Sequence, residues 1–120
     1  MVRAIEELQG AGVEPDVWKV EGIADAAACR AFVDAVRRDG RDGVSCIVLG
    51  RAASDETVAE WLRVAASVEG YRGFAIGRSI FVDAVKAYAA DPEGFDRESA
   101  VDSVARRYRG FVDLYEAAFA

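Results

Sequence analysis

Pro15-Asp16-Val17-Trp18-Lys19-Val20-Glu21-Gly22 contains the unit from which this chain is built: an apolar run that ends in a glycine beside a charged residue. The same arrangement returns in Cys46-Ile47-Val48-Leu49-Gly50-Arg51 and in Phe74-Ala75-Ile76-Gly77-Arg78. Gly22 and Gly50 are 28 positions apart, and Gly50 and Gly77 are 27 apart. Because a helical pattern follows each run, the repeat predicts three strand-turn-helix units of the length that neighbouring parallel strands require.

Apolar periodicity predicts eight elements around this repeat. Strands are expected over 16–21, 44–49 and 73–77, and helices over 2–10, 25–39, 55–68, 79–89 and 97–118. This order predicts an α/β fold in which repeated βα units form a parallel sheet with right-handed crossovers, as one domain over residues 1–120. Three βα units are also the last three of a (β/α)8 barrel, so the fold is expected to be a partial barrel with a long C-terminal helix.

The composition excludes several classes of protein and site. The apolar fraction of 52% is typical of a globular domain, and the net charge of −6 argues against binding nucleic acid. The chain has no histidine, so His-dependent triads and His metal ligands are excluded, and we expect neither a metal nor a cofactor. Cys29 and Cys46 lack metal-ligand spacing and are expected to be buried free thiols.

The chain shows neither a charged-then-apolar leader nor an apolar run of the ~20 residues that a membrane span needs. We therefore expect a cytoplasmic protein that does not bind membranes. A small phosphorylated ligand remains compatible with the net charge, because one or two arginines are enough to hold it.

Lys19 is an unusual cation for its position. The chain has thirteen arginines and two lysines, and Lys19 lies within a strand-like apolar run. Strand alternation predicts that Val17, Lys19 and Glu21 share one face. An amine held in an apolar site has a lowered pKa and can form a Schiff base with a ketone or aldehyde. Glu21 either opposes this by favouring the ammonium or shuttles protons, and the alternative is a Lys-Glu pair that satisfies itself.

Two Gly-Arg pairs occupy matching places at strand ends. Gly50 and Gly77 let the backbone approach an anion closely, and the N–H groups that open the following helix can bind oxyanions. Arg51 and Arg78 add forked donors that fit a phosphate group. The alternative for each pair is a turn glycine beside a solvated arginine, but the repetition at one register favours an anion site.

These residues resemble a known family. The Pro15–Gly22 strand, the strand ending Leu49-Gly50-Arg51 and the run Gly73-Phe74-Ala75-Ile76-Gly77-Arg78-Ser79-Ile80-Phe81 are similar to the last three βα units of Schiff-base (class I) barrel aldolases. The resemblance is to the tagatose-bisphosphate aldolase-like group, and within it to the aldolase-like domain fused to sugar kinases of bacterial inositol catabolism. It extends over nearly the whole chain.

The resemblance implies roles for individual residues. The family's strand-six lysine forms the imine, which implies that role for Lys19. The ends of strands seven and eight hold a substrate phosphate in that family, which implies phosphate contacts for Gly50, Gly77 and Arg78. At the first of these ends the family carries a Ser-Ala-Gly type sequence where this chain has Leu49-Gly50-Arg51. The family's first five strands, with its acid/base residues, have no counterpart here.

Three functions follow from these observations. The first is an aldolase (a lyase) that cleaves a phosphorylated ketose or deoxyketo acid reversibly through an imine at Lys19. The second is a non-catalytic half-barrel that binds a phosphorylated, sugar-like ligand or a protein partner. The third is a free-standing small α/β domain. The first two predict a homo-oligomer or a partner that supplies the missing strands, because a three-stranded barrel segment has open edges and an uncovered face.

Overall fold

The structure, a computed structural model, describes residues 1–51 and 53–119. Its elements in chain order are α1 (Val2–Gly10), β1 (Val17–Glu21), α2 (Ala26–Arg37), β2 (Ser45–Leu49), α3 (Asp55–Ala66), β3 (Tyr71–Ala75), α4 (Arg78–Ala90) and α5 (Arg97–Ala118). The predicted α/β class and the order of elements are confirmed.

The three strands form one parallel sheet in the order β1-β2-β3. In the register between β1 and β2, Val17 lies opposite Ser45 and Glu21 lies opposite Leu49. Leu49 in turn lies opposite Ala75 of β3. The three strands therefore end side by side, and the segments that follow them leave from one edge of the sheet.

One face of the sheet carries the helices, and the other is open. Val20 and Val48 point toward the helices and are almost fully buried, and Trp18 packs against the same core. On the opposite face, Val17 is 47% exposed and Lys19 is also exposed. The predicted alternation along β1 is confirmed, and the lysine face is the open one.

The prediction for β3 is wrong by two residues. The strand begins at Tyr71 rather than at residue 73, because the Tyr71 side chain is 2% exposed and fills the core. A shift in register between β2 and β3 then inserts one extra residue near Gly73, whose φ of 149° suits a bulge at a glycine. As a result Gly77 lies beyond the strand, at the N-cap of α4.

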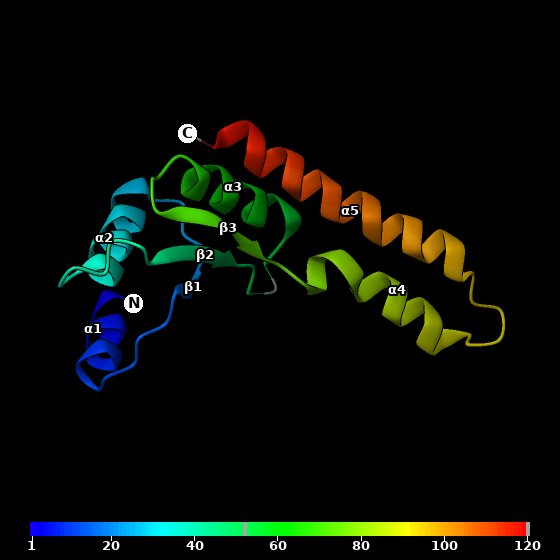
Figure 1. Cartoon of the computed structure of the whole chain (residues 1–120). Coiled ribbons are helices and arrows are strands. Elements are labelled where there is room, and N and C mark those ends of the chain that lie inside the picture. Colours follow the sequence, from blue (N-terminus) through cyan, green and yellow to red (C-terminus); the bar gives the residue numbers. More distant parts are fainter. Residues whose placement is uncertain (52, 120) are drawn as a thin grey trace.

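The last two helices form an antiparallel hairpin that extends away from the sheet (Figure 1). α4 packs along α5, and α5 returns beside α3. Phe111 and Tyr115 of α5 are buried against Phe74 of β3, on the helix side of the sheet. This helix therefore leaves the open face of the sheet uncovered, and Tyr108, one turn before Phe111, is half exposed.

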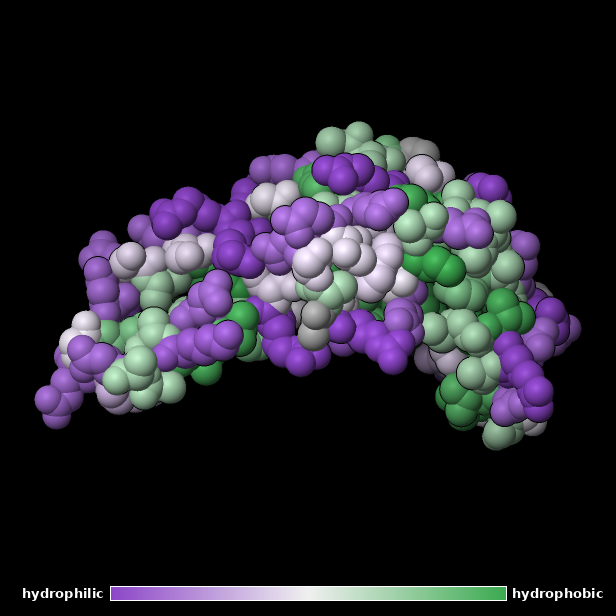
Figure 2. All heavy atoms as spheres, turned by 180° about the vertical axis from the view of Figure 1, so that it is seen from behind, coloured by the Kyte–Doolittle hydropathy of each residue, from purple (hydrophilic) through white to green (hydrophobic). Residues whose placement is uncertain are grey.

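The molecule is elongated. Its radius of gyration is 16.9 Å, whereas a compact domain of this length has roughly 14 Å. Figure 2 shows an arched outline, with hydrophilic side chains along the middle of the concave edge. That part of the edge is where Figure 1 places the ends of the strands.

Candidate functional site

A hollow of about 310 Å³ opens where the three strands end. Its lining residues come from β1 and from the segments that follow β2 and β3: Lys19, Leu49, Gly50, Arg51, Ala75, Ile76, Gly77, Arg78, Ser79 and Phe81. Five of the six predicted site residues are in this set, and the sixth, Glu21, contacts it through Arg51. Residues from three parts of the sequence therefore meet at one edge of the sheet.

Lys19 reaches the hollow from the middle of β1, on the open face of the sheet. Ile47 lies opposite it on β2, so the stem of the lysine runs over apolar surface. The side chain is exposed in this chain, so the water-poor setting predicted for it is not supplied by the described residues.

Glu21 pairs with Arg51 rather than with Lys19. Arg51 Nη1 donates to Glu21 Oε1, which joins the end of β1 to the turn after β2. This hydrogen bond raises the pKa of the Arg51 guanidinium above its ordinary value. The proposed Lys19–Glu21 pair is wrong, because the register brings the end of β1 beside the end of β2, where Arg51 follows.

Arg51 lies in the turn after β2, and its backbone conformation brings it to the hollow. Arg51 has a φ of 40°, an uncommon conformation for a residue with a side chain. The Ala53 N–H donates to the Gly50 carbonyl, 3.0 Å away, and closes the turn. Gly50 itself is buried, and a Cβ there would touch Ile76 at 3.4 Å. Gly50 therefore lies between the turn after β2 and the loop before α4, and that contact leaves room for a larger residue.

The start of α4 differs from the starts of three other helices. Side chains of Asp25, Ser54 and Asp96 accept hydrogen bonds from the first N–H groups of α2, α3 and α5. Gly77, the N-cap of α4, has no side chain to do so. The first turn of α4 therefore has no side-chain cap, and it faces the hollow beside the exposed arginine Arg78.

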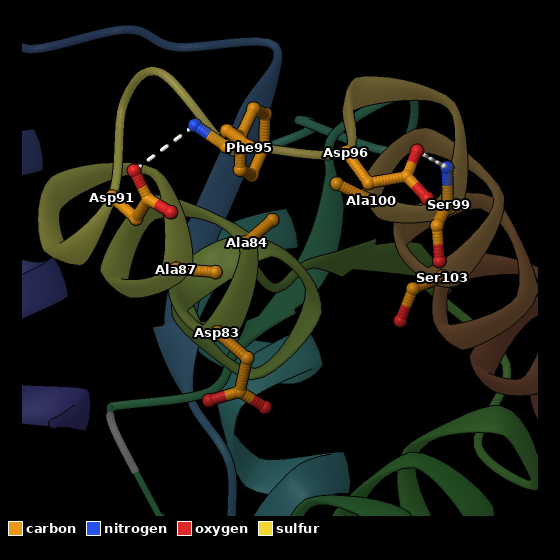
Figure 3. A pocket seen from close by; sticks show the side chains of 10 residues that line it. Asp83, Ala84, Ala87, Asp91, Phe95, Asp96, Ser99, Ala100 and Ser103 are labelled. Atoms are coloured by element: carbon orange, nitrogen blue, oxygen red, sulfur yellow. Dashed lines mark hydrogen bonds between the residues drawn. The ribbon is translucent and has the colours of Figure 1, made fainter.

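A second hollow, of about 360 Å³, lies within the α4–α5 hairpin and has the opposite charge. Figure 3 shows its acidic residues, Asp83, Asp91 and Asp96, with no cation among the side chains drawn. Asp91 accepts the Gly94 N–H at 2.9 Å, and Asp96 accepts the Ser99 N–H at 3.0 Å. Two of these carboxylates thus cap backbone turns, and their charge disfavours a phosphate.

The prediction missed five residues that line the first hollow, of which two, Leu49 and Ala75, are the last residues of β2 and β3. Ser79 and Phe81 line it from the first turn of α4, and Ile76 lines it from the loop before that helix. Ser79 follows Arg78 directly, so its position was available as a signal. Ile76 and Phe81 carry no polar group, and only the course of the chain shows that they border the site.

The cysteines lie away from this edge. Cys29 and Cys46 are buried free thiols, as predicted, and burial raises the pKa of Cys46 to about 12. Among residues 1–51 and 53–119, no cluster of three or more His, Cys, Asp and Glu side chains is placed to hold a metal ion. No helix within those same residues is both long enough and apolar enough to cross a membrane.

Comparison with known proteins identifies a family. A search of curated proteins finds no match. The profile of a family described as "Uncharacterized protein conserved in bacteria (DUF2090)" matches residues 1–119. Since that match covers nearly the whole sequence, the chain belongs to the DUF2090 family.

Proposed function

We propose that this chain is an aldolase-like domain of the class I type, which cleaves and forms a carbon–carbon bond in a phosphorylated ketose or deoxyketo acid. The observation that supports this is the meeting of one primary amine with two Gly-Arg turns in a single hollow. Lys19 supplies an imine-forming group, and Arg51 and Arg78 supply positive charge. Reductive trapping of an imine at Lys19 tests the proposal.

The proposed reaction begins at Lys19. Its neutral Nζ attacks the ketone carbon of the substrate, and loss of water leaves a protonated imine. The substrate hydroxyl next to the breaking carbon–carbon bond then gives its proton to water, the electron pair of that bond moves to the imine nitrogen, and an enamine forms as the aldehyde is released. Protonation of the enamine carbon and hydrolysis by one water return the amine and the second product. Glu21, on the same strand face, is the proposed proton carrier during imine formation.

The proposed anion site lies at the ends of β2 and β3. Arg78 offers a planar fork for a phosphate, and the first N–H groups of α4 point in the direction in which helices bind anions. Barrel enzymes commonly hold phosphate with the loops after strands seven and eight and the N-terminus of an added helix. If β2 and β3 correspond to those strands, α4 is in the place of that added helix.

The same proposal makes the sheet the last three strands of a barrel, completed by further strands. Val17 and Lys19 on the open face would then point into the barrel interior, an apolar setting in which lysines serve as imine-forming nucleophiles. A second copy of the chain or another polypeptide supplies the remainder. The buried free thiols of Cys29 and Cys46 suit the reducing cytoplasm, where we place the protein.

A second candidate is a half-barrel that binds a phosphorylated ligand without chemistry. Two observations favour it: Lys19 is exposed, and Glu21 is bound to Arg51. Both candidates predict anion binding, and the imine at Lys19 separates them.

Arg78→Lys is expected to weaken the binding of inorganic phosphate about tenfold, because a point charge cannot replace a two-pronged contact. Isothermal titration or the phosphate-dependent rise in melting temperature measures this loss. Arg97→Lys is the matched control, since Arg97 is likewise the first residue of a helix but does not line the hollow. If the parent protein gains no stability from phosphate or sulfate, the anion site does not exist.

We expect a homodimer or a larger homo-oligomer in solution at micromolar concentration, held through the open face or edge of the sheet. Val17→Asp places a charge on that face and is expected to raise the dissociation constant at least about tenfold. Leu8→Asp, at a similarly exposed apolar position on α1, serves as the control. Sedimentation equilibrium measures both variants, and a parent protein that stays a stable monomer favours the free-standing α/β domain.

A further inference from the structure

One arginine of α5 joins the first turns of two other helices. Arg107 Nε donates to the Ser79 carbonyl of α4 at 2.6 Å, and its Nη2 donates to Asp55 Oδ2 of α3 at 2.7 Å. Its remaining nitrogen, Nη1, lies 3.7 Å from Asp83 Oδ2, one turn further along α4. All three nitrogens of one guanidinium therefore contact α3 or α4, the two helices that pack against α5.

These contacts lie at the border of the anion hollow, which is the hollow lined by Lys19, Arg51 and Arg78 where the three strands end. Ser79 lines the hollow and follows Arg78 directly. Asp55 is the first residue of α3, four positions after Arg51. The distance between the two Gly-Arg turns therefore depends on how the starts of α3 and α4 are held, and Arg107 is bonded to both.

We propose that Arg107 is a positioning residue of the anion site, which fixes the first turn of α4 against the start of α3 so that Arg51 and Arg78 face one hollow. This inference rests on the proposed function, because it assigns Arg107 to the anion site named there. Arg107 itself does not line the hollow, so its action on a bound phosphate is indirect.

The geometry sets Arg107 apart from an ordinary surface ion pair. Its bond to the Ser79 carbonyl is partly buried, and the Arg107 side chain is only 36% exposed. Figure 3 shows the Asp83 carboxylate pointing away from those of Asp91 and Asp96, which accept the N–H groups of Gly94 and Ser99. Arg109, two positions along α5, pairs instead with Asp113 of its own helix at 2.6 Å and is 66% exposed.

Amide hydrogen exchange tests the positioning role without any ligand. The N–H groups of Ile80 and Phe81 donate to the Gly77 carbonyl at 2.8 and 3.2 Å and report on the first turn of α4. Arg107→Ala is expected to speed their exchange about fivefold to tenfold, while the buried core of α5 near Tyr115 keeps its parent rate. Arg109→Ala, the matched control, is expected to leave Ile80 and Phe81 unchanged.

Titration with inorganic phosphate tests the link to the site. Arg107→Ala is expected to weaken binding about fivefold to tenfold at a temperature where urea titration shows it fully folded. Arg107→Lys is expected to bind as weakly, since one ammonium cannot bond the Ser79 carbonyl and Asp55 together. Adding Asp55→Asn and Asp83→Asn to Arg107→Ala removes the unpaired negative charge, and the positioning role predicts no recovery of binding.

Three results would overturn the inference. The first is parent-like exchange at Ile80 and Phe81 in Arg107→Ala. The second is equal loss of phosphate binding in Arg107→Ala and Arg109→Ala. The third is full recovery on neutralising Asp55 and Asp83, which would assign the effect to charge. Absence of phosphate binding in the parent would instead refute the proposed function, and the exchange rates would still decide whether Arg107 holds the first turn of α4.

Discussion

Borohydride reduction in the presence of dihydroxyacetone phosphate is expected to attach the ligand covalently to Lys19. Reduction converts the imine into a stable secondary amine, so a peptide containing Lys19 gains mass. Lys19→Met is expected to abolish this labelling, because the hollow holds no other primary amine. Peptide mapping by mass spectrometry after proteolysis gives the site and the extent of labelling.

The chain offers a matched control for this experiment, since Lys86 is its only other lysine. Lys86 is exposed on α4 and does not line the hollow. Lys86→Met is therefore expected to be labelled as the parent is. Labelling at Lys86 alone, or none in the folded protein at any ligand concentration, would remove the catalytic proposal and leave the half-barrel that binds without chemistry. Trapping should be repeated with whatever polypeptide covers the open face.

Gly22→Ala is expected to destabilise the fold by about 2–3 kcal/mol. Gly22 follows β1, and a Cβ there would lie 2.3 Å from Trp61 Cε3 and 2.8 Å from its Cγ. A rigid indole cannot yield by bending, so the middle of α3, which carries Trp61, or the end of β1 must move. Thermal unfolding followed by circular dichroism should show a melting temperature lower by about 10 °C.

Gly110→Ala is the control, and it is expected to raise the free energy of unfolding rather than lower it. Gly110 lies exposed inside α5, and a Cβ there meets nothing within 4 Å. Alanine stabilises an exposed helix by roughly 0.5–1 kcal/mol relative to glycine, so the melting temperature should rise. If Gly22→Ala leaves the melting temperature unchanged, Trp61 does not pack on Gly22 in solution.

The three apolar runs that each end in a glycine were enough to predict the parallel sheet and the edge at which the candidate site lies. Strands covered by helices read as continuous apolar runs, and parallel strands bring their ends together. The positions of Lys19, Gly50 and Gly77 at one hollow follow from that rule and from the register.

The features that the sequence did not reveal depend on neighbours distant along the chain. Glu21 has two cations within reach of its strand end, and only the geometry shows that Arg51 is the partner. Arg107 lies 28 positions from Ser79 and 52 from Asp55, a separation that no local pattern reports. The bulge at Gly73 was missed because a glycine before an apolar run also suits the start of a strand.

The elongated outline, 55 Å by 31 Å by 21 Å, determines how this chain moves through solvent. Friction depends on shape as well as mass, so a single copy diffuses more slowly than a sphere of equal weight. On a size-exclusion column calibrated with globular standards it would elute early, at a volume that a compact dimer could share. Elution volume alone therefore cannot count the copies, and a frictional ratio well above that of a compact protein is itself a signature of the projecting α4–α5 hairpin.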